Sequence, residues 1–250
     1  MVAMAMGNDR PRVALLNASH NDEETRRNFR RELDATLVEY NVTENERPTE
    51  FDFDGIVITG SRSSVYWDRD WIQPLIRYTA AADDRDIPIL GVCYGHQVLA
   101  VALGGHVESM DEYELGYRKV TQTQSDALFE DIPNTFTVFT SHSDRVTELP
   151  SDATTLAEND YGIHAFRREN AWGVQFHPEY DRETARSITT NKDLSTDQIE
   201  SVLDGITTEN YAAACKVKQL FENFTAYIRT VQSDYYSEMS TEGEVELEAE

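Results

Sequence analysis

The sequence predicts an α/β protein: a doubly wound, mostly parallel sheet with flanking helices, an antiparallel extension and extra C-terminal helices. Two patterns carry this prediction. Between residues 12 and 105, short apolar runs typical of strands buried on both faces alternate with amphipathic helical segments. Beyond residue 105, short β-branched and aromatic runs are separated by turn residues, which is typical of antiparallel strands.

Three strands and three helices are expected in alternation in the first part of the chain. The strands are Arg12–Ser19, Gly55–Thr59 and Ile87–Val92. The helices are Asp22–Tyr40, Trp67–Ala82 and Val98–Leu103, in which apolar residues recur at helical spacing. This alternation implies right-handed crossovers, and the active site of such a sheet forms at the carboxyl ends of its strands.

The second part is expected to hold five short strands followed by helices. The strands are Val107–Gln122, Phe136–Thr140, Thr154–Ala157, Gly162–Phe166 and Trp172–Phe176. The helices are Asp181–Thr190, Ser195–Leu203 and Thr208–Val231. We therefore expect a single domain at residues 12–230, of which residues 181–230 are a helical extension.

The two ends of the chain are expected to lack fixed structure. Residues 1–11 are predicted to be a flexible N-terminus. From Gln232 onward the chain holds seven acidic residues and no basic one, so residues 231–250 are predicted to be an acidic disordered tail.

The charge balance is strongly acidic. Among 250 residues, 46 acidic side chains outnumber 22 basic ones, the formal net charge is −24, and only four residues are Lys. This composition indicates a halophilic protein, in which high salt screens self-repulsion; an acidic surface that docks a basic partner is the alternative. A nucleic-acid partner is disfavoured, because neutralising phosphates needs clustered Lys and Arg.

Cysteine content and hydropathy bear on the compartment. Cys93 and Cys215 cannot form a disulfide framework, which fits a reducing cytoplasm. No apolar run approaches the roughly 20 residues of a membrane span, so no membrane contact is expected. The N-terminal segment lacks a basic start and is not expected to be a signal peptide.

Cys93 lies where the third apolar strand runs directly into a helical segment. Glycines stand two residues before it and two residues after it, at Gly91 and Gly95. This spacing is typical of a nucleophile elbow, where small residues let strand and helix approach closely around a strained turn. A helix N-terminus also favours the thiolate. The alternative is a small buried residue without chemistry, as we expect for Cys215 on an apolar helical stripe.

His177 and Glu179 supply the base that such a cysteine would need. They stand two apart at the end of the last strand, so their side chains point the same way. The carboxylate can then orient the imidazole while the other ring nitrogen faces a thiol, which is Cys–His–Glu acyl-transfer chemistry. Either motif alone is weak. The six histidines show no ligand spacing, and no metal site is expected.

Together these motifs resemble those of the class I, or triad, glutamine amidotransferases, which have a flavodoxin-like fold. Gly91-Val-Cys-Tyr-Gly-His-Gln97 is similar to the family's nucleophile motif, and Gly173-Val-Gln-Phe-His-Pro-Glu179 to its His/Glu motif. The segment Val138–Val146 is similar to the Ser-His-Gly-Asp segment of the amidotransferase part of GMP synthases. The resemblance covers roughly residues 12 to 180.

The resemblance implies a role for each matching residue. Cys93 would attack the side-chain amide of L-glutamine and form a γ-glutamyl thioester, with His177 as general base and Glu179 orienting it. The oxyanion would be met by backbone N–H groups of Tyr94 and of the turn at Gly60 and Ser61. The amino-acid end of glutamine would be held by Gln97, Ser141 and His142. No cofactor is implied.

The sequence departs from the family pattern at two places. The family's oxyanion loop usually reads Gly-Gly-Pro, whereas here it reads Gly60-Ser61-Arg62. No phosphate loop of an ATP-pyrophosphatase occurs, so a separate ATP-dependent synthetase would receive the ammonia. Two alternatives remain open: a stand-alone hydrolase of γ-glutamyl amines or peptides, and a non-catalytic regulatory protein of the same fold.

Overall fold

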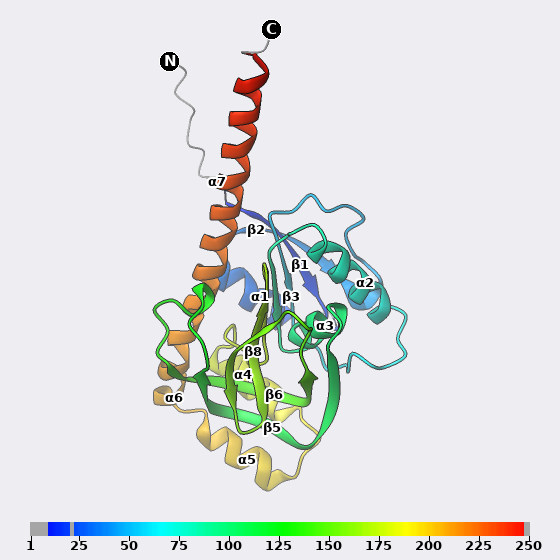
Figure 1. Ribbon diagram of the computed structural model, residues 1–250. Helices are drawn as coiled ribbons and strands as arrows, with labels where there is room; N and C mark the ends of the chain where they lie inside the picture. The colour runs from blue at the N-terminus through cyan, green and yellow to red at the C-terminus, as the bar shows by residue number, and fades with distance from the viewer. Residues whose placement is uncertain (1–9, 21–22, 248–250) are drawn as a thin grey trace.

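The computed structural model describes residues 10–20 and 23–247 and contains one mixed nine-stranded sheet (Figure 1), in the order β2-β1-β3-β4-β9-β8-β7-β5-β6. The parallel strands are β1 Arg12–Asn17, β2 Thr36–Asn41, β3 Gly55–Ile58, β4 Ile89–Val92 and β9 Ala171–Val174. The antiparallel part is formed by β5 His106–Gln122, β6 Thr135–Glu148, β7 Thr154–Asn159 and β8 Gly162–Arg168. The predicted α/β class with an antiparallel extension is confirmed.

Helices cover both faces of the parallel strands, because successive residues of those strands point to opposite sides. Val13 and Leu15 of β1 belong to one apolar cluster, together with residues of α1 Glu23–Glu32 and α7 Gln219–Leu247. Ala14 and Leu16 belong to the other, with α2 Ile72–Asp83 and α3 Tyr94–Ala102. All four side chains are fully buried.

The C-terminal helices pack against the antiparallel strands. They are α4 Arg182–Thr190, α5 Thr196–Gly205 and α6 Thr208–Ala214. Leu115 of β5 and Phe139 of β6 form a small apolar cluster with Ala185 and Ile206 from this region. Ser195 starts α5 with a capping box, in which its hydroxyl and the Gln198 side chain satisfy each other's backbone N–H groups.

The segment after α1 differs from the prediction. The helix predicted at Asp22–Tyr40 ends at Glu32, and Thr36–Asn41 forms β2, paired in parallel with β1 at the edge of the sheet. Leu37 and Val38 fit helical spacing as well as strand alternation. The free edge of β1 decides between the two, since tertiary pairing overrides a short local pattern.

The long helix predicted at Thr208–Val231 is also divided. α6 is followed by a 3₁₀ turn at Cys215–Lys218 before α7 begins. Cys215 is half-buried beside Tyr211, so its assignment to the core is wrong.

At the chain ends, α7 continues to Leu247 and extends away from the sheet in Figure 1, which differs from the disorder expected from residue 231. Glu, a good helix former, is frequent there, and such residues extend an established helix more readily than they start one. The expected flexible N-terminus falls largely on residues 1–9, outside the described residues. Within the described part, no helix is both long and apolar enough to cross a membrane.

Candidate active site

Cys93 occupies a strained turn between β4 and α3. Its φ of 53° and ψ of −102° lie in a region that non-glycine residues rarely adopt, and such strain is concentrated at functional sites. A Cβ on Gly91 would lie 2.3 Å from the carbonyl oxygen of Gly95, and one on Gly95 would lie 2.2 Å from that of Ile58. Only glycine therefore allows strand and helix to meet here.

His177 and Glu179 form a buried pair next to this turn. The imidazole Nδ1 is 2.8 Å from Glu179 Oε1, and the charge of Cys93 also acts on the ring. Burial alone would lower the pKa of His177, but the negative charges of Cys93 and Glu179 outweigh it and raise the pKa to about 10. The ring also stacks on Tyr180, with 4.1 Å between the centroids.

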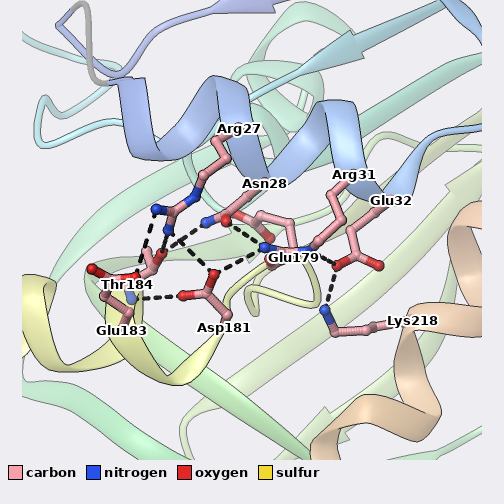
Figure 2. A network of polar contacts seen from close by, with 9 residues as sticks. All are labelled: Arg27, Asn28, Arg31, Glu32, Glu179, Asp181, Glu183, Thr184 and Lys218. Atoms are coloured by element: carbon pink, nitrogen blue, oxygen red, sulfur yellow. Dashed lines mark hydrogen bonds and ion pairs between the residues drawn. The ribbon is translucent and has the colours of Figure 1, made fainter.

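A network of ion pairs from α1 holds the segment that follows His177 (Figure 2). Arg31 donates from Nη2 to the backbone carbonyl of Glu179 at 2.6 Å and from Nη1 to Asp181 Oδ2 at 2.9 Å. Arg27 reaches the same Asp181 oxygen at 3.2 Å. Because Asp181 also caps α4 through the backbone N–H of Thr184, the network links α1, Glu179 and α4.

The loop after β3 approaches Cys93 and His177 closely. A Cβ on Gly60 would lie 2.8 Å from Cε1 of His177 and 3.6 Å from Cβ of Cys93, so the loop can lie this near only with glycine at that position. Ser61 Oγ accepts from the backbone N–H of Ser63 at 3.2 Å, which shapes the turn. Tyr94 is the first residue of α3, where backbone N–H groups lack intrahelical partners.

Gln97, Ser141 and His142 lie together beside Cys93. The amide nitrogen of Gln97 donates to the backbone carbonyl of Asp144 at 3.1 Å and to Gln175 Oε1 at 3.2 Å. The backbone carbonyl of Ser141 is 4.0 Å from the Cys93 sulfur. The imidazole of His142 contacts Glu114 rather than Cys93, so the backbone of this segment is the part that faces the Cys93 sulfur.

His142 belongs to a buried polar cluster that also contains Glu114 and His164. Glu114 Oε2 lies 2.6 Å from His142 Nε2 and 3.1 Å from His164 Nε2, and all three ligand atoms lie within 4.8 Å of one another. The sequence did not reveal the group, because its members come from three strands. Two ligand atoms of a tetrahedral zinc ion lie roughly 3.3 Å apart. The distance of 2.6 Å between His142 Nε2 and Glu114 Oε2 is shorter, which indicates a hydrogen bond rather than two ligands of one metal ion.

One cavity of about 350 Å³ collects these residues. All residues that the sequence placed in the site line it: Gly60, Ser61, Cys93, Tyr94, Gln97, Ser141, His142, His177 and Glu179. Sequence reasoning missed Tyr113 and Lys192, which also line the cavity. Tyr113 lies where β5 is out of register with β6, between Ser109 and Glu114, and Lys192 follows α4. No motif marks either residue.

The fold and the site together define a class of protein. A thiol at a strand-to-helix turn beside an imidazole–carboxylate pair is the arrangement of cysteine-dependent acyl-transfer enzymes. The chain belongs to the class I glutamine amidotransferase family, whose model, described as "Glutamine amidotransferase class-I", matches residues 18–194. It is therefore an enzyme of a family that acts on a carbon–nitrogen amide bond.

Curated relatives match part of this region. A protein of Vibrio atlanticus named "GMP synthase [glutamine-hydrolyzing]" is 40% identical over 133 residues, which are 52% of this chain and 25% of that protein. An Aliivibrio fischeri protein of the same name is 39% identical over the same length. The matched region thus spans about a quarter of these relatives.

Solved structures show the same fold. A Thermotoga maritima glutamine amidotransferase is 20% identical, with a TM-score of 0.72 over 86% of this chain and 97% of that one. A Thermoplasma acidophilum protein described as a putative component of GMP synthase is 21% identical, with a TM-score of 0.63 over 90% of this chain and 98% of that one. At these identities the likeness bears on the fold alone.

Proposed function

We propose that the enzyme hydrolyses the side-chain amide of L-glutamine to glutamate and ammonia through a γ-glutamyl thioester on Cys93. One observation supports this proposal above all: Cys93 at a strained turn lines the same cavity of about 350 Å³ as the hydrogen-bonded pair His177 and Glu179. Family membership adds support for an amide substrate.

The first half of the reaction forms the thioester. The Cys93 sulfur attacks the amide carbon, and the oxyanion is stabilised by the backbone N–H of Tyr94 and by the turn at Gly60 and Ser61. His177 gives its proton to the amide nitrogen, the carbon–nitrogen bond breaks, and ammonia leaves. Glu179 keeps the imidazole oriented through its 2.8 Å contact with Nδ1.

The second half of the reaction releases glutamate. Water attacks the thioester carbon while His177 accepts one proton of the water. The carbon–sulfur bond then breaks, glutamate leaves, and the Cys93 thiolate is restored beside the protonated imidazole. No cofactor is needed for either half, and Gln97 with the backbone of Ser141 and His142 holds the amino-acid end of the substrate throughout.

The ammonia acceptor is proposed to be an ATP-dependent synthetase of the GMP synthase kind. The relative of Vibrio atlanticus named "GMP synthase [glutamine-hydrolyzing]" matches this chain over only 25% of its own length. The synthetase part of such a protein would then lie outside these 250 residues.

The proposed compartment is the cytoplasm. Both cysteines are free, which suits a reducing environment.

A second candidate is a hydrolase of γ-glutamyl amines or peptides. The observation that favours it is that Ser61 and Arg62, which depart from the family's loop, and Lys192 of the C-terminal extension line the substrate cavity, whose shape they would alter. Free glutamine and γ-glutamyl amides, assayed side by side, separate the two. A much larger kcat/KM for the γ-glutamyl amide would favour the hydrolase.

The test of the proposed function is the intact mass after reaction with an electrophilic glutamine analogue, followed by peptide mapping. A single adduct on Cys93 is expected. Cys93→Ala should lose the adduct and reduce ammonia release by at least about 10³-fold, whereas the matched variant Cys215→Ala should retain both. Ammonia release by Cys93→Ala at a rate near that of the wild type would show that Cys93 is not the nucleophile.

A further inference from the structure

Lys192 presents an unusual cation to the cavity. Its side chain is half-buried, and among the described residues no carboxylate lies within salt-bridge distance of its ammonium group. The group instead makes a hydrogen bond with the phenol of Tyr113 and lies 4.6 Å from the centre of that ring. A cation that leaves water without an anionic partner is costly, which suggests that a ligand supplies the anion.

Neither nearby acidic group of the protein is a lasting partner for Lys192. Burial raises the pKa of Tyr113 to about 12, so the phenol stays neutral. The Cys93 thiolate does attract Lys192, but the same thiolate interacts with His177, and its charge disappears when the thioester forms. An anion that remains through the reaction must therefore come from elsewhere.

Arg62 strengthens the positive field on the same cavity. It is exposed, lines the cavity and has no ion pair among residues 10–20 and 23–247. Burial lowers the pKa of Lys192 to about 8; Cys93 opposes this shift, and Arg62 adds to it. An anion bound between the two cations would relieve their mutual repulsion.

We propose that Lys192, assisted by Arg62, binds the α-carboxylate of the γ-glutamyl substrate and so determines specificity for that group. The inference rests on the proposed function, because every γ-glutamyl substrate carries this carboxylate a few bonds away from the amide that Cys93 attacks. Two acidic residues of the cavity have other partners: Glu179 contacts His177, and Asp144 Oδ1 accepts from Tyr66 at 2.9 Å. Asp193, also at the cavity, is suited to the α-ammonium group.

The test compares the alkylation of Cys93 by a reagent that carries an α-carboxylate with its alkylation by a reagent that carries none. Cys93 alkylation is followed by peptide mapping with a chloroketone analogue of glutamine, which has the carboxylate, and with iodoacetamide, which does not. Lys192→Met should reduce the wild-type preference for the analogue by about tenfold, and Lys192→Arg should restore most of it. Lys119→Met, which removes an exposed Lys outside the cavity, should leave the preference unchanged.

Steady-state kinetics give a second measure. The ratio of kcat/KM for glutamine to that for 4-aminobutanamide, which lacks only the carboxylate, should fall about tenfold in Lys192→Met, mainly through KM for glutamine. Equal slowing with both alkylating reagents would mean that Lys192 acts on the thiolate alone and would overturn the inference. A wild-type protein with no preference for the glutamine analogue would contradict the proposed function itself.

Discussion

Two groups of cations lie near the pair His177 and Glu179, one behind Glu179 and one at the cavity, and they differ in their partners. Behind Glu179, the side chains of Arg27, Arg31 and Lys218 all contact carboxylates, at Asp181 or Glu32 (Figure 2). In front, Arg62 and Lys192 face the cavity with no such partner among the described residues. Paired cations hold a structure in place, whereas unpaired cations in a cavity are ready for an anionic ligand.

The comparison predicts different kinetic effects. Changes behind the pair should alter the orientation of Glu179 and so lower kcat. Changes in front should alter substrate affinity and so raise KM. The predictions below run from the largest expected effect to the smallest.

Glu179 is the residue through which the rear network acts, so its substitution should have the largest effect. Glu179→Gln should lower kcat by roughly 10²–10⁴-fold, because the amide cannot stabilise the imidazolium as the carboxylate does. Steady-state ammonia release measures the change. A loss of less than about threefold would mean that the 2.8 Å contact with His177 is dispensable.

The same contact predicts a pH dependence of stability. The pKa of His177 is raised from 6.5 to about 10 in the folded protein, so the protonated ring stabilises the fold fully below pH 6.5, and this contribution is lost as pH rises through about 10. The stability advantage of the wild type over His177→Gln should therefore shrink between these values. Urea unfolding at several pH values measures it, and an advantage that grew with pH would contradict the assignment.

Arg31 tests positioning without touching the reacting atoms. Arg31→Met removes the hydrogen bond to the carbonyl of Glu179 and should lower kcat about tenfold, with KM nearly constant. Arg27→Met is the matched control, since Arg27 contacts Asp181 rather than the carbonyl of Glu179. Equal effects of the two variants would mean that net charge, rather than the Glu179 contact, is responsible.

The two lysines should affect stability with opposite sign. Lys218→Met breaks a half-buried pair with Glu32 and should lower the free energy of unfolding by about 1–2 kcal/mol. Lys192→Met removes a cation that has no anionic partner and should raise it by roughly 1 kcal/mol. Denaturant titration of both variants without substrate decides this. A destabilised Lys192→Met would contradict the view that its cation awaits a ligand.

Salt should act on the whole surface rather than on either group. With a net charge of −24, the melting temperature should rise as KCl increases from about 0.1 M to about 1 M, because the Debye length falls from about 10 Å to about 3 Å. The stability difference between the two lysine variants should change much less. A melting temperature independent of KCl would count against adaptation to high salt.

Local patterns were sufficient to predict the turn at Cys93. The glycines two residues on either side are set by contacts of 2.2–2.3 Å that a Cβ would make, and such steric limits act over a few residues. His177 and Glu179 also pair as the sequence predicted, at 2.8 Å. They lie beyond β9, which ends at Val174, so strand alternation is not the reason for the pairing. The two residues are close in the sequence, and a short-range contact of this kind can be predicted from local spacing.

Short segments with two compatible patterns could not be assigned in this way. Thr36–Asn41 fits a helix or a strand, and the open edge of β1 makes it β2. The helix predicted to span Thr208–Val231 is divided at Cys215–Lys218, where Val217 is buried in the apolar cluster that includes strand residues such as Val13. In both cases the deciding contact is distant in sequence.

The sequence by itself determined the fold class, the strained turn at Cys93 and the pairing of His177 with Glu179, since these depend on periodicity and steric limits within a few residues. Only the tertiary structure decided which other groups share the cavity. The Glu114 cluster joins three strands, Tyr113 reaches the site through the irregular register of β5, and Lys192 arrives from beyond α4. Contacts between residues so distant in sequence depend on how the whole sheet and its helices pack, and no local sequence pattern predicts them.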